Sequence, residues 1–175
     1  MKKLFFLVAV LFASSSLFAQ TSLEVIREGD GTKILKGLIN KNEFVADTAF
    51  AWYAKNAKSF TPNAEVVKQY SANKDKVNFV VFGGTWCEDT QALLPKFFAT
   101  TDAAGIADNR FTFIGVDRSK KTLFNLTEAF GVTNVPTIIV MKDGKEIGRV
   151  VEYGKTGMPE KEVAGMLAAP APAKK

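Results

Sequence analysis

Apolar blocks alternate with amphipathic stretches over the second half of the chain, and these blocks predict strands and helices in turn. Continuous apolar runs are typical of strands covered on both faces of a sheet, whereas apolar residues three or four apart indicate helices. The predicted strands span 77–82, 111–116, 137–141 and 145–151, and the predicted helices span 87–100, 123–130 and 159–167. The order β-α-β-α-β-β-α, with a hairpin turn at Asp143-Gly144, predicts an α/β domain with a mixed central sheet flanked by helices.

Residues 20–76 precede this pattern and predict a mainly helical N-terminal extension packed on the domain. The expected elements are a strand at 23–26, a turn at Asp30-Gly31, helical segments at 35–45 and 48–60, and a helix from Thr61 and Pro62 to about Ser71. We expect the aromatic residues of the extension to pack in the core rather than to form a ligand site. They are Phe50, Trp52, Tyr53 and Phe60.

The two ends of the chain are expected to lie outside the fold. A positively charged start, an apolar stretch at 4–12 and small residues up to Ala19 are typical of a cleaved signal peptide, here 1–19. The apolar stretch is too short for a stable membrane anchor, so we expect no stable membrane insertion after cleavage. The mature protein would be periplasmic or otherwise exported, with a domain at 77–168 and a disordered Ala/Pro/Lys tail at 169–175.

Composition narrows the possible functions. The formal net charge of +5 falls to +3 without Lys2 and Lys3, and the remaining lysines are scattered among acidic residues, so we expect no nucleic-acid partner. The chain has no histidine, which removes Ser-His and Cys-His catalysis and the commonest zinc ligand. One thiol is a poor metal site alone, so we expect no metal and no cofactor.

The single cysteine, Cys87, carries the candidate chemistry. An odd cysteine in an exported protein suggests a reactive thiol or an intermolecular partner. Cys87 follows the predicted strand 77–82 and opens the predicted helix 87–100, where free N–H groups and the helix dipole favour a thiolate. Trp86 and the preceding glycines leave its sulfur on an accessible rim. An inert buried cysteine is the alternative.

Four motifs at matching spacings give the chain a family resemblance. They are Trp86-Cys87, Pro95 eight residues after the cysteine, Val135-Pro136-Thr137, and Lys142-Asp143-Gly144. Residues 77–167 therefore resemble a thioredoxin, and the signal peptide and extension resemble the exported thioredoxin-like proteins of Gram-negative bacteria. The resemblance implies a thioredoxin-like fold, with Cys87 as the nucleophile.

Two positions depart from the family pattern. Thr90 stands where dithiol thioredoxins have their second cysteine, and Val81 stands where they commonly have a buried aspartate. The resemblance makes Thr90 part of the catalytic site, where its hydroxyl can donate a hydrogen bond to a thiolate but cannot resolve a disulfide. An adduct on Cys87 would then need an external resolving thiol, such as glutathione or a partner protein. The departures at Thr90 and Val81 together predict a monothiol Cys-x-x-Thr site.

The resemblance also assigns neighbouring residues. Trp86, Val135 and Pro136 would bind the substrate, with a cis bond before Pro136 and the backbone of Val135 offered to an extended chain. Glu88 and Asp89 would tune the thiol: as anions they favour the first helical turn but oppose a thiolate. Helix capping alone is an equally open interpretation of this acidic pair.

Several function hypotheses remain open. The first is a monothiol disulfide oxidoreductase or isomerase whose partners are protein or low-molecular-weight disulfides. The alternative is a redox-inactive thioredoxin-fold binding module. A peroxidase ranks last, because Gly84 stands where peroxiredoxins need a threonine three residues before the cysteine. Asp117-Arg118 is interpreted as a solvated loop.

Overall fold

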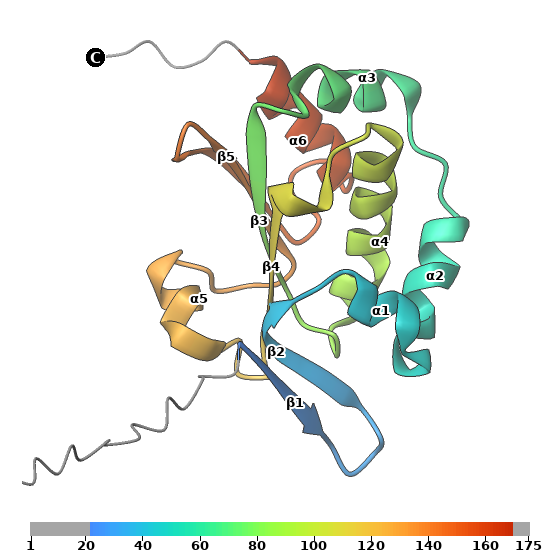
Figure 1. Cartoon of the computed structure of the whole chain (residues 1–175), viewed down its shortest axis with the longest axis vertical. Helices are drawn as coiled ribbons and strands as arrows, with labels where there is room; N and C mark the ends of the chain where they lie inside the picture. Colours follow the sequence, from blue (N-terminus) through green and yellow to red (C-terminus); the bar gives the residue numbers. More distant parts are fainter. Residues whose placement is uncertain (1–21, 170–175) are drawn as a thin grey trace, which may run out of the picture.

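A computed structural model describes residues 22–169 of the chain. The predicted signal peptide at 1–19 lies outside these residues, as does all but the first residue of the predicted tail at 169–175. The described residues form one sheet with helices on both faces (Figure 1).

The sheet has six strands in the order β1-β2-β4-β3-β5-β6. β3 and β4 are parallel, and all the other neighbouring strands are antiparallel, which confirms the predicted mixed sheet. The strands are β1 (Leu23–Arg27), β2 (Lys33–Ile39), β3 (Val77–Gly83), β4 (Phe111–Gly115), β5 (Thr137–Lys142) and β6 (Lys145–Val151).

The helices divide between the two faces of the sheet. In Figure 1, α5 lies alone on one face, and the other α-helices lie on the opposite face. The α-helices are α1 (Asn42–Ala46), α2 (Ala51–Lys58), α3 (Ala64–Asn73), α4 (Glu88–Ala103), α5 (Leu126–Ala129) and α6 (Pro159–Ala168). Short 3₁₀ turns occupy η1 (Thr48–Phe50), η2 (Asp108–Arg110) and η3 (Leu123–Asn125). None of these helices is long and apolar enough to cross a bilayer.

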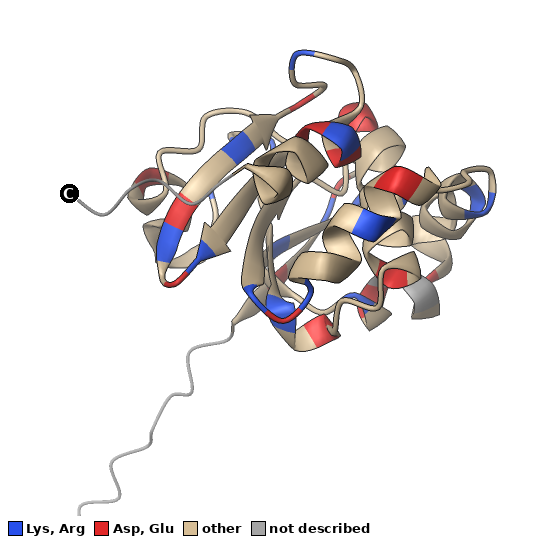
Figure 2. Cartoon of the chain, turned by 90° about the horizontal axis from the view of Figure 1, so that it is seen from above, with Lys and Arg blue, Asp and Glu red and all other residues tan. Residues whose placement is uncertain are grey.

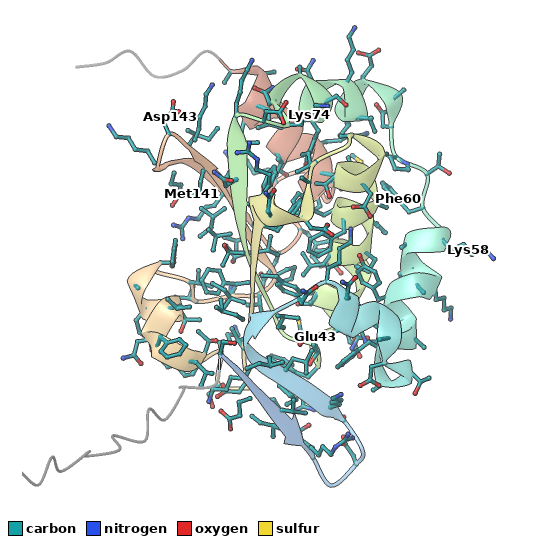
Figure 3. The ribbon with its side chains drawn as sticks, viewed as in Figure 1. Glu43, Lys58, Phe60, Lys74, Met141 and Asp143 are labelled. Carbon is teal, nitrogen blue, oxygen red and sulfur yellow. The ribbon has the colours of Figure 1, made fainter. Side chains whose placement is uncertain are left out.

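Aromatic rings dominate the core between the sheet and α4, where the side chains fill the space in Figure 3. Phe79 of β3 lies at its centre, with ring centroids 5.5 Å from Phe97 and 5.3 Å from Phe111. Such offset and edge-on pairs add to the free energy gained from burying apolar area. Of the aromatics in the extension, Phe50 and Tyr53 are buried in this core as predicted.

The N-terminal extension differs from the prediction most at residues 33–39. Residues 33–39 form strand β2, whereas the sequence pattern indicated a helical segment at 35–45. Leu35 and Ile39 are buried on one side of the sheet and Ile34 on the other, so the period is two rather than three or four. The pattern was hard to interpret because the adjacent residues Ile34 and Leu35 are both buried, while Leu38 is an exposed apolar residue, so the apolar residues of the strand do not alternate with polar ones. The extension therefore contributes two strands to the sheet as well as its helices.

Two helix starts also differ from the prediction. α3 begins after Asn63, whose side-chain oxygen accepts hydrogen bonds from the N–H groups of Glu65 and Val66. Asparagine is a better N-cap than threonine, and this displaces the start predicted at Thr61. The predicted helix at 123–130 is a 3₁₀ turn followed by the short α5, because the backbone turns left-handed between them.

Charged residues of both signs are interspersed over the surface seen in Figure 2. Many are paired, as in the ion pairs Lys33–Asp47, Lys41–Asp102 and Lys121–Glu128.

Candidate functional site

Cys87 lies at the junction of β3 and α4. The chain leaves β3 at Gly83, turns through the loop at residues 84–86 (the site loop), and enters α4 with Cys87 as its N-cap. The Cys87 N–H donates to the carbonyl of Gly84 at 2.9 Å, which closes this turn. The thiol is half-buried and free. Cys87 is therefore the N-cap residue of α4, although its side chain makes no capping hydrogen bond.

The Val135-Pro136 segment lies directly beside the thiol. Cys87 Sγ donates to the carbonyl oxygen of Val135 at 3.5 Å, although the two residues are 48 positions apart. The Val135-Pro136 peptide bond is cis, and both residues are buried. The structure therefore brings together three of the residues that the sequence singled out.

Thr90 is fully buried and has a different hydrogen-bond partner from the one expected. Its hydroxyl accepts a hydrogen bond from the Gly84 N–H at 3.2 Å. Among the hydrogen bonds of residues 22–169, none joins Thr90 to Cys87. In this arrangement Thr90 holds the start of the site loop. Val81, at the other departure from the family pattern, is completely buried in the core.

Trp86 forms the side of the site that faces the end of β4. Its indole N–H donates to the carbonyl of Val116 at 3.0 Å. The guanidinium of Arg118 lies 5.5 Å from the centre of the Trp86 ring, within the range of a cation–π contact. Arg118 is held in turn by both carboxylate oxygens of Glu28, from the β1–β2 turn. This pairing lowers the pKa of Glu28.

The N-terminal extension binds the site loop a second time, through Thr85. The Thr85 hydroxyl donates to the carbonyl of Lys33 at 3.0 Å and accepts from the N–H of Leu35 at 3.2 Å. β2 pairs with β4 only from Gly37 to Ile39, so Lys33 and Leu35 lie beyond the paired stretch. The Thr85 hydroxyl therefore makes the hydrogen bonds with β2 that the backbone of a neighbouring strand would otherwise make at this point.

The acidic pair after Cys87 lies in the first turn of α4. The Asp89 carboxylate accepts a hydrogen bond from the hydroxyl of Tyr153 at 2.9 Å. This hydrogen bond is the largest cause of a raised pKa at Tyr153, and the charges of Asp89, Cys87 and Glu88 act in the same direction. Tyr153 follows β6, and the loop that carries it is bound to the Pro136 carbonyl at 2.7 Å by the N–H of Glu152.

Sequence reasoning missed Thr85, Arg118 and Tyr153 as neighbours of the site. Arg118 was interpreted as part of a solvated loop, and it is half-exposed, but it also lies over Trp86. No local pattern marks these residues, because each reaches its partner across a long stretch of sequence. An aromatic residue two positions after the predicted strand 145–151 was the available signal for Tyr153.

We found no group of three or more His, Cys, Asp or Glu side chains within 22–169 that could hold a metal ion. Two surface hollows lie beside the β1–β2 hairpin, and no predicted site residue lines either of them.

Fold and site together define a thioredoxin-like α/β protein with one half-buried thiol at the start of a helix. A model of the thioredoxin-like domain matches residues 64–168, which is more than half of the chain, and the chain belongs to this family. The match begins at α3, so β1, β2, α1 and α2 precede it. Membership supports, in general terms, a thiol–disulfide redox protein whose partners are protein disulfides and thiols.

Individual relatives agree with this family. A thioredoxin of Echinococcus granulosus is 34% identical over 86 residues, which cover 49% of this chain and 75% of that protein. A thioredoxin of Staphylococcus saprophyticus is 29% identical over 93 residues, covering 50% of this chain and 85% of that protein. The crystal structure of an HIV epitope scaffold superposes with a TM-score of 0.53 at 17% identity, covering 75% of this chain and 93% of that one. That likeness concerns the fold alone.

Proposed function

We propose that this protein is an exported, monothiol thioredoxin-like protein that carries out thiol–disulfide exchange through Cys87. The observation that supports this most is the position of its only cysteine. Cys87 is half-buried at the N-terminus of α4 and contacts the Val135 carbonyl, so a disulfide bound along this segment would meet the sulfur.

The proposed cycle consists of two thiol–disulfide exchange steps. A thiolate at Cys87 attacks one sulfur of a substrate disulfide, forms a mixed disulfide and releases the other half as a thiolate. An external thiolate then attacks the mixed disulfide, regenerates the Cys87 thiolate and leaves with the substrate sulfur in a new disulfide. Two disulfides are broken and two are formed over the cycle, with no net oxidation or reduction.

The cycle needs an external thiol because position 90 holds a threonine rather than a second cysteine. Thr90 occupies the position one helical turn after Cys87, is fully buried, and its hydroxyl already binds the site loop. A hydroxyl does not attack a disulfide under these conditions, because the exchange requires a thiolate. The mixed disulfide therefore persists until a second molecule supplies the thiol.

The proposal that the protein is exported rests on the sequence of residues 1–19. Their positive charge, apolar stretch and small residues before Gln20 match a signal peptide. In an oxidising compartment, disulfides are abundant as substrates. Expression of the full chain with a C-terminal tag, followed by fractionation and N-terminal sequencing, tests this part. We expect a mature N-terminus near Gln20 in the exported fraction, and a retained Met1 would contradict export.

Adduct formation tests the chemical part. Incubation with a low-molecular-weight disulfide such as oxidised glutathione should add one glutathione to the wild type and none to Cys87→Ser, as measured by intact mass. Equal labelling of the two proteins would refute the proposal.

A gain-of-function variant tests the role of position 90. In Thr90→Cys the introduced thiol should attack the mixed disulfide and release the adduct, leaving an internal disulfide. Thr90→Val, which keeps the size without sulfur, is the matched control and should keep the adduct. An adduct equally long-lived in both variants would contradict the reason given for the external thiol.

A redox-inactive binding module is the second candidate, and one contact favours it. Cys87 Sγ contacts the Val135 carbonyl at 3.5 Å, so the segment that would receive an extended peptide is formed even without any exchange at the sulfur. A binding module predicts that Cys87→Ala captures the same partner peptides as the wild type, without any mixed disulfide.

A further inference from the structure

Tyr153 makes a contact with the Cys87 site that family resemblance did not suggest. It lies in the loop after β6, 64 residues from Asp89, yet its hydroxyl donates to Asp89 at 2.9 Å. Tyr153 is 46% exposed, so it is not a core residue. The hydrogen bond to Asp89 is the specific interaction that fixes its orientation.

The loop that carries Tyr153 is itself anchored beside the substrate-facing segment. The N–H of Glu152 donates to the Pro136 carbonyl at 2.7 Å, and the Tyr153 carbonyl accepts from the N–H of Gly157 at 2.9 Å. Glu152 has a φ of +53°, a conformation that costs free energy for a residue with a side chain. The backbone therefore holds a strained turn directly before the residue that contacts the first turn of α4.

Asp89 is the group through which Tyr153 can act on the thiol. The charges of both Asp89 and Cys87 act on Tyr153, and Asp89 is two residues from Cys87 in the chain. A carboxylate near a sulfur opposes ionisation of that sulfur. A phenol that donates to the carboxylate spreads its negative charge and fixes its orientation. The charged and titratable groups on the elements next to Cys87 are Glu88 and Asp89 in the first turn of α4, Glu152 and Tyr153 in the loop after β6, and Arg118 over Trp86.

We propose that Tyr153 is a positioning residue of the Cys87 site: its hydroxyl holds the Asp89 carboxylate and so limits the repulsion between this carboxylate and a thiolate at Cys87. The inference deepens the proposed function and rests on it for its biological meaning. The pKa of Tyr153 is raised by the same hydrogen bond, so the phenol stays protonated and keeps donating over the pH range in which thiols ionise.

A double-mutant cycle tests the coupling. The rate of Cys87 alkylation by iodoacetamide is measured against pH in the full-length mature protein and in Tyr153→Phe, Asp89→Asn and the double variant. Loss of the phenol should raise the midpoint of the profile by roughly 0.2 to 0.7 pH units, the range expected for one exposed charge interaction. Asp89→Asn should lower the midpoint, and adding Tyr153→Phe to it should change nothing further.

Met158→Ala, a change at an exposed residue of the same loop, is the matched control and should leave the midpoint unchanged. Circular dichroism of each variant checks that the fold is intact. A Tyr153→Phe shift of the same size in both backgrounds, or no shift in either, would overturn the inference. Because alkylation needs no substrate disulfide, the cycle gives its result even if the wild type forms no adduct with glutathione, and the two failures are therefore distinguishable.

Discussion

Replacing Thr85 by valine tests how firmly the N-terminal hairpin holds the site loop. Thr85 is 3% exposed, and its hydroxyl makes two hydrogen bonds to the backbone of β2, at Lys33 and Leu35. Valine has the same shape but removes both bonds and leaves a carbonyl and an N–H without a partner at a buried position. Each buried group left unpaired costs about 1–3 kcal/mol.

The expected loss for Thr85→Val is therefore about 2–4 kcal/mol, since the β2 backbone can relax partly toward water at its exposed end. For a domain of this size, such a loss lowers Tm by about 5–15 °C. Urea unfolding followed by circular dichroism measures the free energy, and differential scanning calorimetry measures Tm.

Thr85→Ser is the matched control, because it keeps the hydroxyl and removes only a methyl group. We expect it to retain most of the stability that valine loses. If the free energy of unfolding of Thr85→Val lies within about 0.5 kcal/mol of the wild-type value, the usual range for neutral surface changes, the hydrogen bonds of this hydroxyl do not hold the site loop to β2.

Three further predictions concern other contacts. In Glu28→Gln the guanidinium over Trp86 loses its ionic partner, so we expect the Trp86 fluorescence emission to shift in a Trp52→Phe background; an unchanged spectrum would contradict the contact. The pKa of Glu128 is lowered to about 2, mainly by its hydrogen bond from Lys121, so its stabilising contribution is complete above its ordinary value near 4.5 and is lost as pH falls toward 2. Thermal unfolding should show a smaller loss over this window in Glu128→Gln than in the wild type, and parallel curves would count against the pairing. A Cβ at Gly115 would lie 2.1 Å from a carbonyl oxygen of β2, so Gly115→Ala should separate β2 from β4 and unfold the protein at a clearly lower urea concentration, whereas a wild-type midpoint would disprove that close approach.

Local signals predicted the elements that carry the site. The apolar run of β3, the cysteine at a helix start and the Val135-Pro136 pair were all legible in the sequence, and the structure brings them together. Each depends on residues close to it in the chain: a buried strand needs continuous apolar residues, and a helix start needs a suitable N-cap.

The contacts around the site were not predictable in the same way. Tyr153 reaches Asp89, and Thr85 reaches Lys33, only because the sheet places distant segments side by side. A threonine or tyrosine has no periodicity of its own, so its partner depends on topology. β2 was misread for another reason: the adjacent residues Ile34 and Leu35 are both buried and Leu38 is exposed, so the alternation by which a strand is recognised is missing.

The position of β2 between β1 and β4 has a consequence for how the protein acquires its site. β2 can pair with β1 as soon as the hairpin has been synthesised, but Gly37 pairs with Gly115, much later in the chain. Closing so long a loop is slow compared with forming a hairpin. Val116 and Val135, which contact Trp86 and Cys87, also come later in the chain than the cysteine. Until they have been synthesised and placed, the sulfur of a newly made chain lacks these neighbours and is more accessible to other disulfides than it is in the fold.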